Sequence, residues 1–362
     1  MKALSEEGGA PTAVAALRRL APALVVLVVV SVIDLATPAQ WTLQPVMSAA
    51  PALAAATCSL GGTALVGTLA LALANFEALA HDTWGDNEFD VTMVAIAAVC
   101  LASLLTCHAR LRQQRELLRT RLIAEAAQRV LMRPMPPRLG LVNLAALYIA
   151  AQEDAQIGGD VYECLDTPFG ARLLIGDVRG KGLAAVEASA ALLTSFREAA
   201  HTEETISAVA SRLEAGVQRY VANCGIDYPE CFATALIVEI LPHGTARIVH
   251  CGHPAALMIS DGHIRVIEPT SAGLPLGLSE FGDDRFVPDE FGFARGDRLL
   301  LCTDGVSECR DREGLFYPLP ERLSGWTEQP ITAVIDALHV DLLRHCGGRL
   351  QDDAAVLAVE RV

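Results

Sequence analysis

Four short motifs between residues 158 and 353 place an aspartate beside glycine or a second aspartate. They are Gly158-Gly159-Asp160, Gly176-Asp177-Val178, Thr303-Asp304-Gly305 and Asp352-Asp353. Strand-like apolar runs adjoin three of them: Leu173 to Ile175, Leu299 to Leu301 and Ala354 to Val359. Carboxylates at strand ends, with glycine permitting close backbone approach, are what a site for hard divalent cations requires. A single Asp-Gly pair predicts only a turn, whereas four such motifs at strand edges predict a metal site.

The spacing of the cysteines and histidines does not predict a site for a softer metal. Octahedral oxygen ligation suits Mg²⁺ or Mn²⁺. The chain has 10 cysteines, none in CxxC spacing, and several lie in apolar runs. We interpret them as reduced, mostly buried thiols of a cytoplasmic protein and not as a disulfide framework.

Charge is unevenly distributed along the 362 residues. Residues 1–138 carry 11 Lys and Arg against 10 Asp and Glu, whereas residues 139–362 carry 17 against 33. An acidic C-terminal half argues against nucleic acid as a partner, because phosphates require a basic face.

Three apolar runs in the first third predict a membrane region. They are Leu20 to Ala36, Leu43 to Phe76 and Val91 to Cys107. Arg18-Arg19 before the first run is also compatible with a signal peptide, but no Ala-x-Ala site follows and further apolar runs do. A retained, membrane-embedded segment with lipid contacts is therefore the favoured interpretation.

The arginines predict the topology of this region. Arg18 and Arg19 precede the first run, five arginines follow the last one, and residues 77–90 contain neither Lys nor Arg. The positive-inside rule places both basic flanks in the cytoplasm, which requires an even number of spans. We therefore predict four short spans, with the long run turning at Cys58 to Gly62; three spans is the alternative.

A charged helix is predicted from His108 to Met132, because this stretch lacks Gly and Pro and ends at Pro134. Its apolar positions do not make a strict coiled-coil repeat. Two interpretations stay open: a juxtamembrane helix with arginines near anionic headgroups, or a contact surface of a homodimer through residues 108–132.

From Leu139 onward the pattern is mixed α and β. Predicted strands cover Leu144 to Ala150, Arg172 to Ile175, Ala233 to Ile240, Thr245 to Cys251, Ala255 to Ser260, Arg298 to Cys302 and Ala354 to Val359. Predicted helices cover Leu183 to Ala200, Thr205 to Val221 and Ile331 to His345. Strands grouped on either side of a helix pair favour an α+β fold with antiparallel sheets flanked by helices.

Further motifs accompany the aspartates in a fixed order. They are Gln128-Arg129-Val130-Leu131, Ile157-Gly158-Gly159-Asp160, Gly176-Asp177-Val178-Arg179-Gly180-Lys181-Gly182, Phe232-Ala233-Thr234-Ala235, Cys251-Gly252-His253-Pro254, Pro275-Leu276-Gly277-Leu278, Thr303-Asp304-Gly305 and Asp352-Asp353. Over residues 128–359 this order resembles the bacterial PPM phosphatases of the SpoIIE/RsbU type, which are PP2C-like metal-dependent serine/threonine phosphatases.

The resemblance implies a two-sheet β-sandwich with helices on both outer faces and two divalent cations, Mn²⁺ or Mg²⁺, at one sheet edge. Asp177 matches the carboxylate that bridges both cations, and the Val178 carbonyl matches a further ligand. Asp160, Asp304 and Asp352 match the other metal carboxylates. Such a pair of cations activates a water for attack on phosphorus.

Other residues of the motifs have weaker implications. Asp353 and Glu308 are expected to support the metal ligands without binding metal themselves. Lys181 either contacts substrate phosphate or lies in a solvated turn, and Arg179 stands where relatives more often carry serine. His253 either donates a proton to the leaving group or has a structural role.

The sequence therefore predicts a membrane-anchored serine/threonine phosphatase whose substrate is a phosphorylated cytoplasmic regulatory protein; the resemblance suggests a STAS-type antagonist. Residues 1–19 form a cytoplasmic tail, 20–107 the membrane region, 108–138 the linker helix and 139–362 the catalytic domain. The alternative is a catalytically silent membrane receptor or scaffold that uses the same fold to bind a partner. The presence of all four metal aspartates argues against this alternative.

Overall fold

The structure is a computed structural model that describes residues 13–37, 43–81, 84, 87–150, 158–180, 182–224, 231–271, 273–279 and 286–362. The chain forms two compact units, Met1–Leu118 and Arg119–Val362. Each unit has a hydrophobic core of its own. The two units are therefore described separately.

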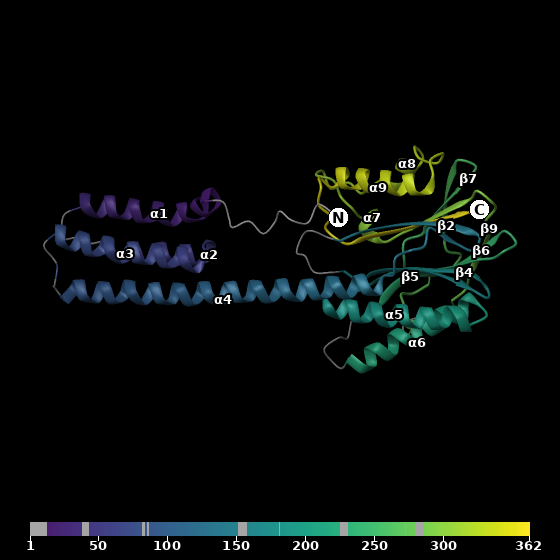
Figure 1. The fold of residues 1–362 in the computed structure, drawn as a ribbon, viewed down its shortest axis with the longest axis horizontal. Coiled ribbons are helices and arrows are strands. Elements are labelled where there is room, and N and C mark those ends of the chain that lie inside the picture. The colour runs from purple at the N-terminus through teal and green to yellow at the C-terminus, as the bar shows by residue number, and fades with distance from the viewer. Residues whose placement is uncertain are drawn as a thin grey trace. The chain divides into compact units, whose positions relative to one another are not determined.

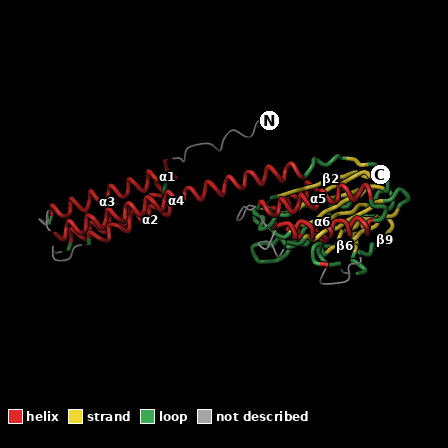
Figure 2. Tube along the Cα trace, turned by 90° about the horizontal axis from the view of Figure 1, so that it is seen from below, coloured by secondary structure: helices red, strands yellow, loops and turns green. Residues whose placement is uncertain are grey.

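The N-terminal unit consists of apolar helices packed side by side (Figure 2). They are α1 (Ala13–Ala36), the 3₁₀ helix η1 (Gln44–Ser48), α2 (Ala49–Thr57), α3 (Leu60–Ala80) and the first part of α4 (Asn87–Leu131). Ser59 caps α3 by accepting a hydrogen bond from the Gly62 backbone N–H at 3.3 Å. The buried positions of these helices are rich in alanine, and such small side chains let helix backbones approach closely.

Three helical segments of the described chain are long and apolar enough to cross a membrane. They are Leu17–Ala36, Leu60–Ala80 and Phe89–Gln128, with mean hydropathies of 2.2, 1.6 and 2.1. The long apolar run does turn between α2 and α3, but its halves are unequal. α3 has 21 residues, whereas η1 has five and α2 nine. The latter pair reaches about 24 Å, short of the roughly 30 Å of membrane hydrocarbon.

Hydrogen bonds at the ends of these helices show that four segments alternate in direction. At one end, the Cys58 Sγ–H donates to the Arg19 carbonyl, and the Arg110 guanidinium donates to the carbonyls of Ala56 and Cys58. At the other end, the Leu43 N–H donates to Asp34. The chain from Leu43 to Cys58 therefore runs back along α1. Arg19 and Arg110 consequently lie at the same end of the N-terminal unit.

The last apolar span and the predicted linker helix form one continuous helix. α4 has 45 residues, because neither Gly nor Pro interrupts the sequence between Asn87 and Leu131. The predicted boundary at His108 is therefore not an element boundary. The last turns of α4 belong to the C-terminal unit, where Ala124 packs against Val186. This compact unit begins at Arg119; the catalytic-domain boundary at residue 139 stays a prediction.

The C-terminal unit contains two antiparallel sheets, a six-stranded sheet with strand order β1-β2-β11-β10-β7-β8 and a five-stranded sheet with strand order β3-β4-β5-β6-β9. The strands are β1 (Arg138–Leu139), β2 (Val142–Ile149), β3 (Asp160–Thr167), β4 (Gly170–Val178), β5 (Ala233–Ile240), β6 (Thr245–Cys251), β7 (Ala256–Ser260), β8 (His263–Ile267), β9 (Asp289–Gly292), β10 (Arg298–Cys302) and β11 (Ala354–Arg361). Apolar side chains from both sheets form the core between them, including Leu173, Val238 and Leu357.

Helices cover both outer faces of this sandwich (Figure 1). α5 (Leu183–Thr202) and α6 (Ile206–Cys224) pack on the five-stranded sheet, whereas α8 (Leu319–Leu323) and α9 (Ile331–His345) pack on the six-stranded sheet. A single turn of helix, α7 (Asp304–Ser307), follows β10. The predicted α+β sandwich flanked by helices is confirmed.

Candidate metal centre

Asp160 and Asp177 lie opposite each other on neighbouring strands. β3 begins at Asp160, and Asp177 is the penultimate residue of β4; the antiparallel register pairs the two directly. Residues paired in this way share one face of the sheet, with β-carbons about 4.5–5.5 Å apart. Two of the predicted carboxylates therefore converge at this edge of the sandwich.

The second sheet contributes Asp304 and Asp352 to the same edge. Asp304 is the first residue of α7 after β10, and Asp352 lies just before β11, which pairs with β10. Thr303 connects the two sheets. Its hydroxyl donates to Asp160 Oδ2 at 2.7 Å and accepts a hydrogen bond from the Ala355 N–H at 2.9 Å.

The motif glycines stand where backbones approach one another. A β-carbon on Gly159 would lie 1.9 Å from the Val178 carbonyl oxygen, and one on Gly305 would lie 1.8 Å from the Asp353 carbonyl oxygen. Neither position tolerates a side chain unless the backbone moves. Glycine next to aspartate is thus a packing requirement here, which brings the carboxylates and the Val178 carbonyl together.

The converging carboxylates destabilise one another's charged forms. Burial raises the pKa of Asp160 well above its ordinary value, and the charge of Asp177 raises it further. Burial, followed by the charges of Asp304 and Asp352, raises the pKa of Asp177 to about 7. Burial and Asp352 also raise the pKa of Asp304. This concentration of negative charge favours a bound cation, which would relieve the repulsion.

The donor set fits hard divalent cations. It consists of carboxylate oxygens and the backbone carbonyl of Val178, which are ligands that Mg²⁺ and Mn²⁺ prefer. Among the described residues, no three His, Cys, Asp or Glu side chains are already spaced to hold one ion; the carboxylates converge pairwise. Mg²⁺ is commonly bound by one or two carboxylates and several waters, so pairwise convergence is sufficient for it.

The Asp353 carboxylate accepts hydrogen bonds from two distant parts of the chain. Its Oδ2 accepts from the Gly158 N–H at 2.9 Å and from the Tyr148 hydroxyl. Tyr148 in turn accepts from Gln128 Nε2 at 2.7 Å. Burial and the Asp353 charge raise the pKa of Tyr148, so its hydroxyl stays a donor. Gln128 lies on α4, and this chain of contacts therefore links α4 to the loop that carries Asp160.

Arg179 and Glu308 lie beside the centre, and both side chains are exposed. The Arg179 guanidinium stacks on the Phe232 ring, 5.1 Å from its centroid. The Glu308 N–H donates to the Asp304 carbonyl at 2.7 Å, which closes α7. Lys181 lies outside the described residues.

His253 fits the structural alternative better than the catalytic one. The side chain is buried, and its Nδ1 lies 2.8 Å from the Thr234 hydroxyl. Thr234 is on β5 and pairs with Asp177 of β4. Burial lowers the pKa of His253 to about 3. The imidazole is therefore neutral near pH 7 and does not supply a proton as a charged acid.

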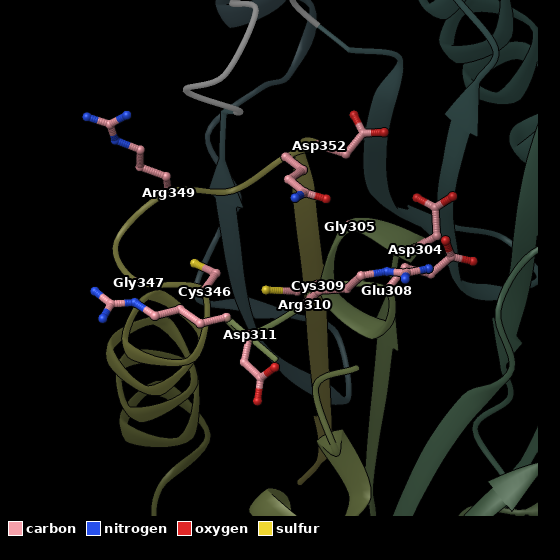
Figure 3. Close-up of a pocket in the computed structure, with 12 residues that line it drawn as sticks. Asp304, Gly305, Glu308, Cys309, Arg310, Asp311, Cys346, Gly347, Arg349 and Asp352 are labelled. Carbon is pink, nitrogen blue, oxygen red and sulfur yellow. The ribbon is translucent and has the colours of Figure 1, made fainter. Parts of the chain in front are cut away.

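A cleft of about 740 Å³ opens beside Asp304 and Asp352 (Figure 3). Its lining includes three arginines that the sequence reasoning did not select: Arg310, Arg312 and Arg349. Arginine recognises phosphate and carboxylate groups through its planar set of donors. Their closeness in sequence to the aspartate motifs could have indicated them: Arg310 and Arg312 follow α7 closely, and Arg349 lies three residues before Asp352.

The raised pKa of Asp177 predicts how stability depends on pH without metal. The folded state binds this proton more tightly than the unfolded state, so Asp177 becomes progressively destabilising as the pH rises from about 4 to about 7. With a chelator present, Asp177→Asn should therefore melt a few degrees above wild type at pH 8 and converge with it near pH 4. Thermal melting across this range checks the prediction; a wild type that melts higher than the variant at pH 8 contradicts it.

These features define the class of the C-terminal unit: it is a PP2C-type protein phosphatase domain. The SiaA-PP2C domain of Pseudomonas aeruginosa has the same fold, with a TM-score of 0.56, 17% sequence identity and coverage of 69% of this chain and 98% of that one. The RsbU and RsbW domains of a Mycobacterium tuberculosis protein match with a TM-score of 0.50 and 26% identity. That match covers 61% of this chain and 60% of that one.

The sequence comparisons identify the family. The profile of the family described as Stage II sporulation protein E (SpoIIE) matches residues 168–362, which is more than half of the chain. Phosphoserine phosphatase RsbU of Bacillus subtilis (strain 168) is 22% identical over 246 residues, which cover 66% of this chain and 69% of RsbU. The chain belongs to the SpoIIE family, and the predicted SpoIIE/RsbU resemblance is confirmed.

Proposed function

We propose that this protein is a membrane-anchored phosphatase that removes phosphate from serine or threonine of a regulatory protein, using two divalent cations, Mn²⁺ or Mg²⁺. One observation carries the proposal: aspartates from both sheets converge at one edge, where burial and then the charges of Asp304 and Asp352 raise the pKa of Asp177 to about 7. Membership of the SpoIIE family supports the same activity.

Each residue of the centre has a distinct part in this function. Asp160, Asp177, Asp304 and Asp352, with the Val178 carbonyl, would hold the cations. Asp177 pairs with Asp160 and is affected by the charges of Asp304 and Asp352, so it would be the ligand that the cations share. When bound, two such cations stabilise the charge on phosphate and make a water nucleophilic. Thr303 orients Asp160 through its hydrogen bond, and Asp353 fixes the Gly158 backbone. In this mechanism neither Thr303 nor Asp353 forms a covalent bond with phosphate.

The arginine-lined cleft is the docking surface for the phosphoprotein in this proposal. Arg310, Arg312 and Arg349 line it together with Asp304 and Asp352, so a phosphoryl group at the carboxylates would have arginines nearby. RsbU is named a phosphoserine phosphatase, which supports phosphoserine as the substrate group. A phosphorylated STAS-type antagonist is the specific substrate that we propose.

Phosphate release by the full-length protein in detergent tests this function. With Mn²⁺ present, phosphoserine or phosphothreonine peptides should lose phosphate, and a chelator should abolish the release. Phosphotyrosine peptides are the matched control and should react far more slowly. Release that persists in chelator contradicts the metal-dependent mechanism. No release from any peptide or from p-nitrophenyl phosphate would instead favour the silent scaffold.

The helices of the N-terminal unit support a membrane anchor with both basic flanks in the cytoplasm. Arg19 and Arg110 meet at Cys58, at one end of this unit. Under the positive-inside rule that end is cytoplasmic, and the α3–α4 loop lies outside. This topology requires four crossings, and the second, formed by η1 and α2, is a short one of about 24 Å.

Reporter fusions check this topology. A fusion after Asp86 should report an extracytoplasmic position, and a fusion after Arg121 a cytoplasmic one, because arginines are retained on the cytoplasmic side. A cytoplasmic signal at Asp86 contradicts four crossings. A signal on the same side for both fusions would show that α4 does not cross the membrane.

We also propose that α4 pairs with its copy in a homodimer and thereby favours the active arrangement of the metal-site loops. Leu118, Leu122 and Val130 are 55%, 64% and 80% exposed on α4, although this region is charged. Leu111, on the same helix, is half-buried. The contacts from Gln128 through Tyr148 to Asp353 supply a physical connection between α4 and the centre.

Inserting four Gly/Ser residues after Arg121 tests this coupling. The insertion should lower both the dimer fraction and the activity of the full-length enzyme, because a flexible tether cannot transmit helix pairing. A seven-residue helical insertion at the same place is the control, since two turns nearly preserve the direction of the apolar side. If the Gly/Ser insertion changes neither quantity, α4 is only a spacer.

A further inference from the structure

A second group of carboxylates lies inside the N-terminal unit, away from the phosphatase centre. Asp34 of α1 and Glu77 of α3 are 1% and 0% exposed. Ser31 and Gln44 are buried as well, at 8% and 4%. Polar side chains within an apolar bundle are costly and are retained where they bind something or pair with one another. All four residues lie outside residues 168–362, which the SpoIIE family profile matches.

Neither carboxylate is fully compensated by the protein. Both oxygens of Glu77 lack a hydrogen-bond partner among the described residues, as does Asp34 Oδ2. Asp34 Oδ1 accepts from the Leu43 N–H. The titratable groups beside Glu77 in the described chain are Asp34 and His81. His81 Nε2 lies 3.9 Å from Asp34 Oδ2, which is too long for a hydrogen bond.

Without a bound cation, the second negative charge on two adjacent carboxylates in such surroundings is costly, because burial and like charge each oppose it. With only two carboxylates, a metal ion would need water molecules for its remaining ligands. Asp34 and Glu77 are 1% and 0% exposed, so this site has little access for water, unlike the phosphatase centre. A proton needs only one or two oxygens, so it is the cation that fits.

We propose that Asp34 and Glu77 form a proton-binding site in the membrane region. One proton from solvent binds a carboxylate of the pair, whose charge changes from doubly to singly negative. The His81 side chain, 16% exposed against 1% for Asp34, lies on the route from solvent. The site is at the end of the unit opposite Arg19 and Arg110, which faces away from the cytoplasm in the proposed topology. Its occupancy therefore responds to external pH.

Infrared difference spectroscopy of the full-length protein in detergent tests this site without any phosphatase assay. The carbonyl band of protonated carboxyl groups is recorded between about pH 5 and pH 8. Wild-type-minus-variant spectra remove the carboxyl groups of the catalytic unit. Glu77→Gln should remove one pH-dependent part of this carbonyl band. Asp34→Asn should remove the same part or shift the pH at which it titrates. Asp90→Asn, at an exposed position of α4, is the matched control and should leave it unchanged.

Replacing sodium by choline, and adding Ca²⁺, separates a proton from a metal cation. A titrating carboxyl band that is the same in both salts and is unaffected by Ca²⁺ supports the proton site. A band that Na⁺ or Ca²⁺ removes at constant pH overturns it in favour of a metal cation. Spectra in which neither Glu77→Gln nor Asp34→Asn changes the titrating band also overturn the proposal. Two variants are used so that misfolding of one does not decide the outcome.

Discussion

Replacing Asp177 by asparagine is expected to lower turnover of p-nitrophenyl phosphate by several orders of magnitude. Asp177 lies directly opposite Asp160, and its pKa responds to Asp304 and Asp352 as well. Removing its charge therefore weakens cation binding at every carboxylate pair that includes Asp177. A catalytic cation would lose its bridging ligand. Steady-state kinetics at saturating Mn²⁺ measure the effect.

Asp166→Asn is the matched control for this experiment. Asp166 lies on β3 like Asp160, but its side chain is exposed, so activity should stay close to wild type. If Asp177→Asn retains more than about a tenth of wild-type turnover at saturating Mn²⁺, the assignment of Asp177 as the bridging ligand is wrong.

Gly159→Ala should have the second-largest effect, although it changes no functional group. The new methyl would lie 1.9 Å from the Val178 carbonyl oxygen and 2.7 Å from the Val178 nitrogen. The two backbone segments must then move apart, which costs about 1–3 kcal/mol in the free energy of unfolding. Displacement of the Val178 carbonyl should also weaken Mn²⁺ binding by about 10–100-fold. Chemical denaturation and Mn²⁺ titration measure the two effects.

Gly292→Ala provides the comparison for Gly159→Ala. A β-carbon on Gly292 would meet no atom within 4 Å, so this variant should bind Mn²⁺ like wild type. Equal stability and Mn²⁺ affinity of the two variants would show that the close approach at Gly159 does not shape the centre.

The sequence was sufficient to predict the architecture because local patterns determine much of it. Short apolar runs predicted Ala233–Ile240, Thr245–Cys251 and Arg298–Cys302 with the observed bounds. β3 was not predicted, because Asp160 to Thr167 mixes acidic residues with apolar ones and lacks a clear alternation. This strand is nevertheless where Asp160 is placed opposite Asp177.

Contacts between distant parts of the chain were beyond sequence reasoning. Tyr148 meets Asp353 across 205 positions, and Gln128 reaches Tyr148 from α4; no local pattern reports such a contact. Asp34 and Glu77 were each visible as single acids near apolar runs, but only helix packing buries them in one bundle. The arginines around the cleft likewise require the fold to come together with Asp352.

Counting Mn²⁺ ions bound at equilibrium tests the central claim most directly, namely that the aspartates of the two sheets hold the catalytic cations. Equilibrium dialysis of the metal-free full-length protein should give about two Mn²⁺ per chain, and Asp177→Asn should lose most of this binding in the same concentration range. A wild-type protein that binds no Mn²⁺ would contradict the account. So would an Asp177→Asn variant that binds the same number of ions with the same affinity.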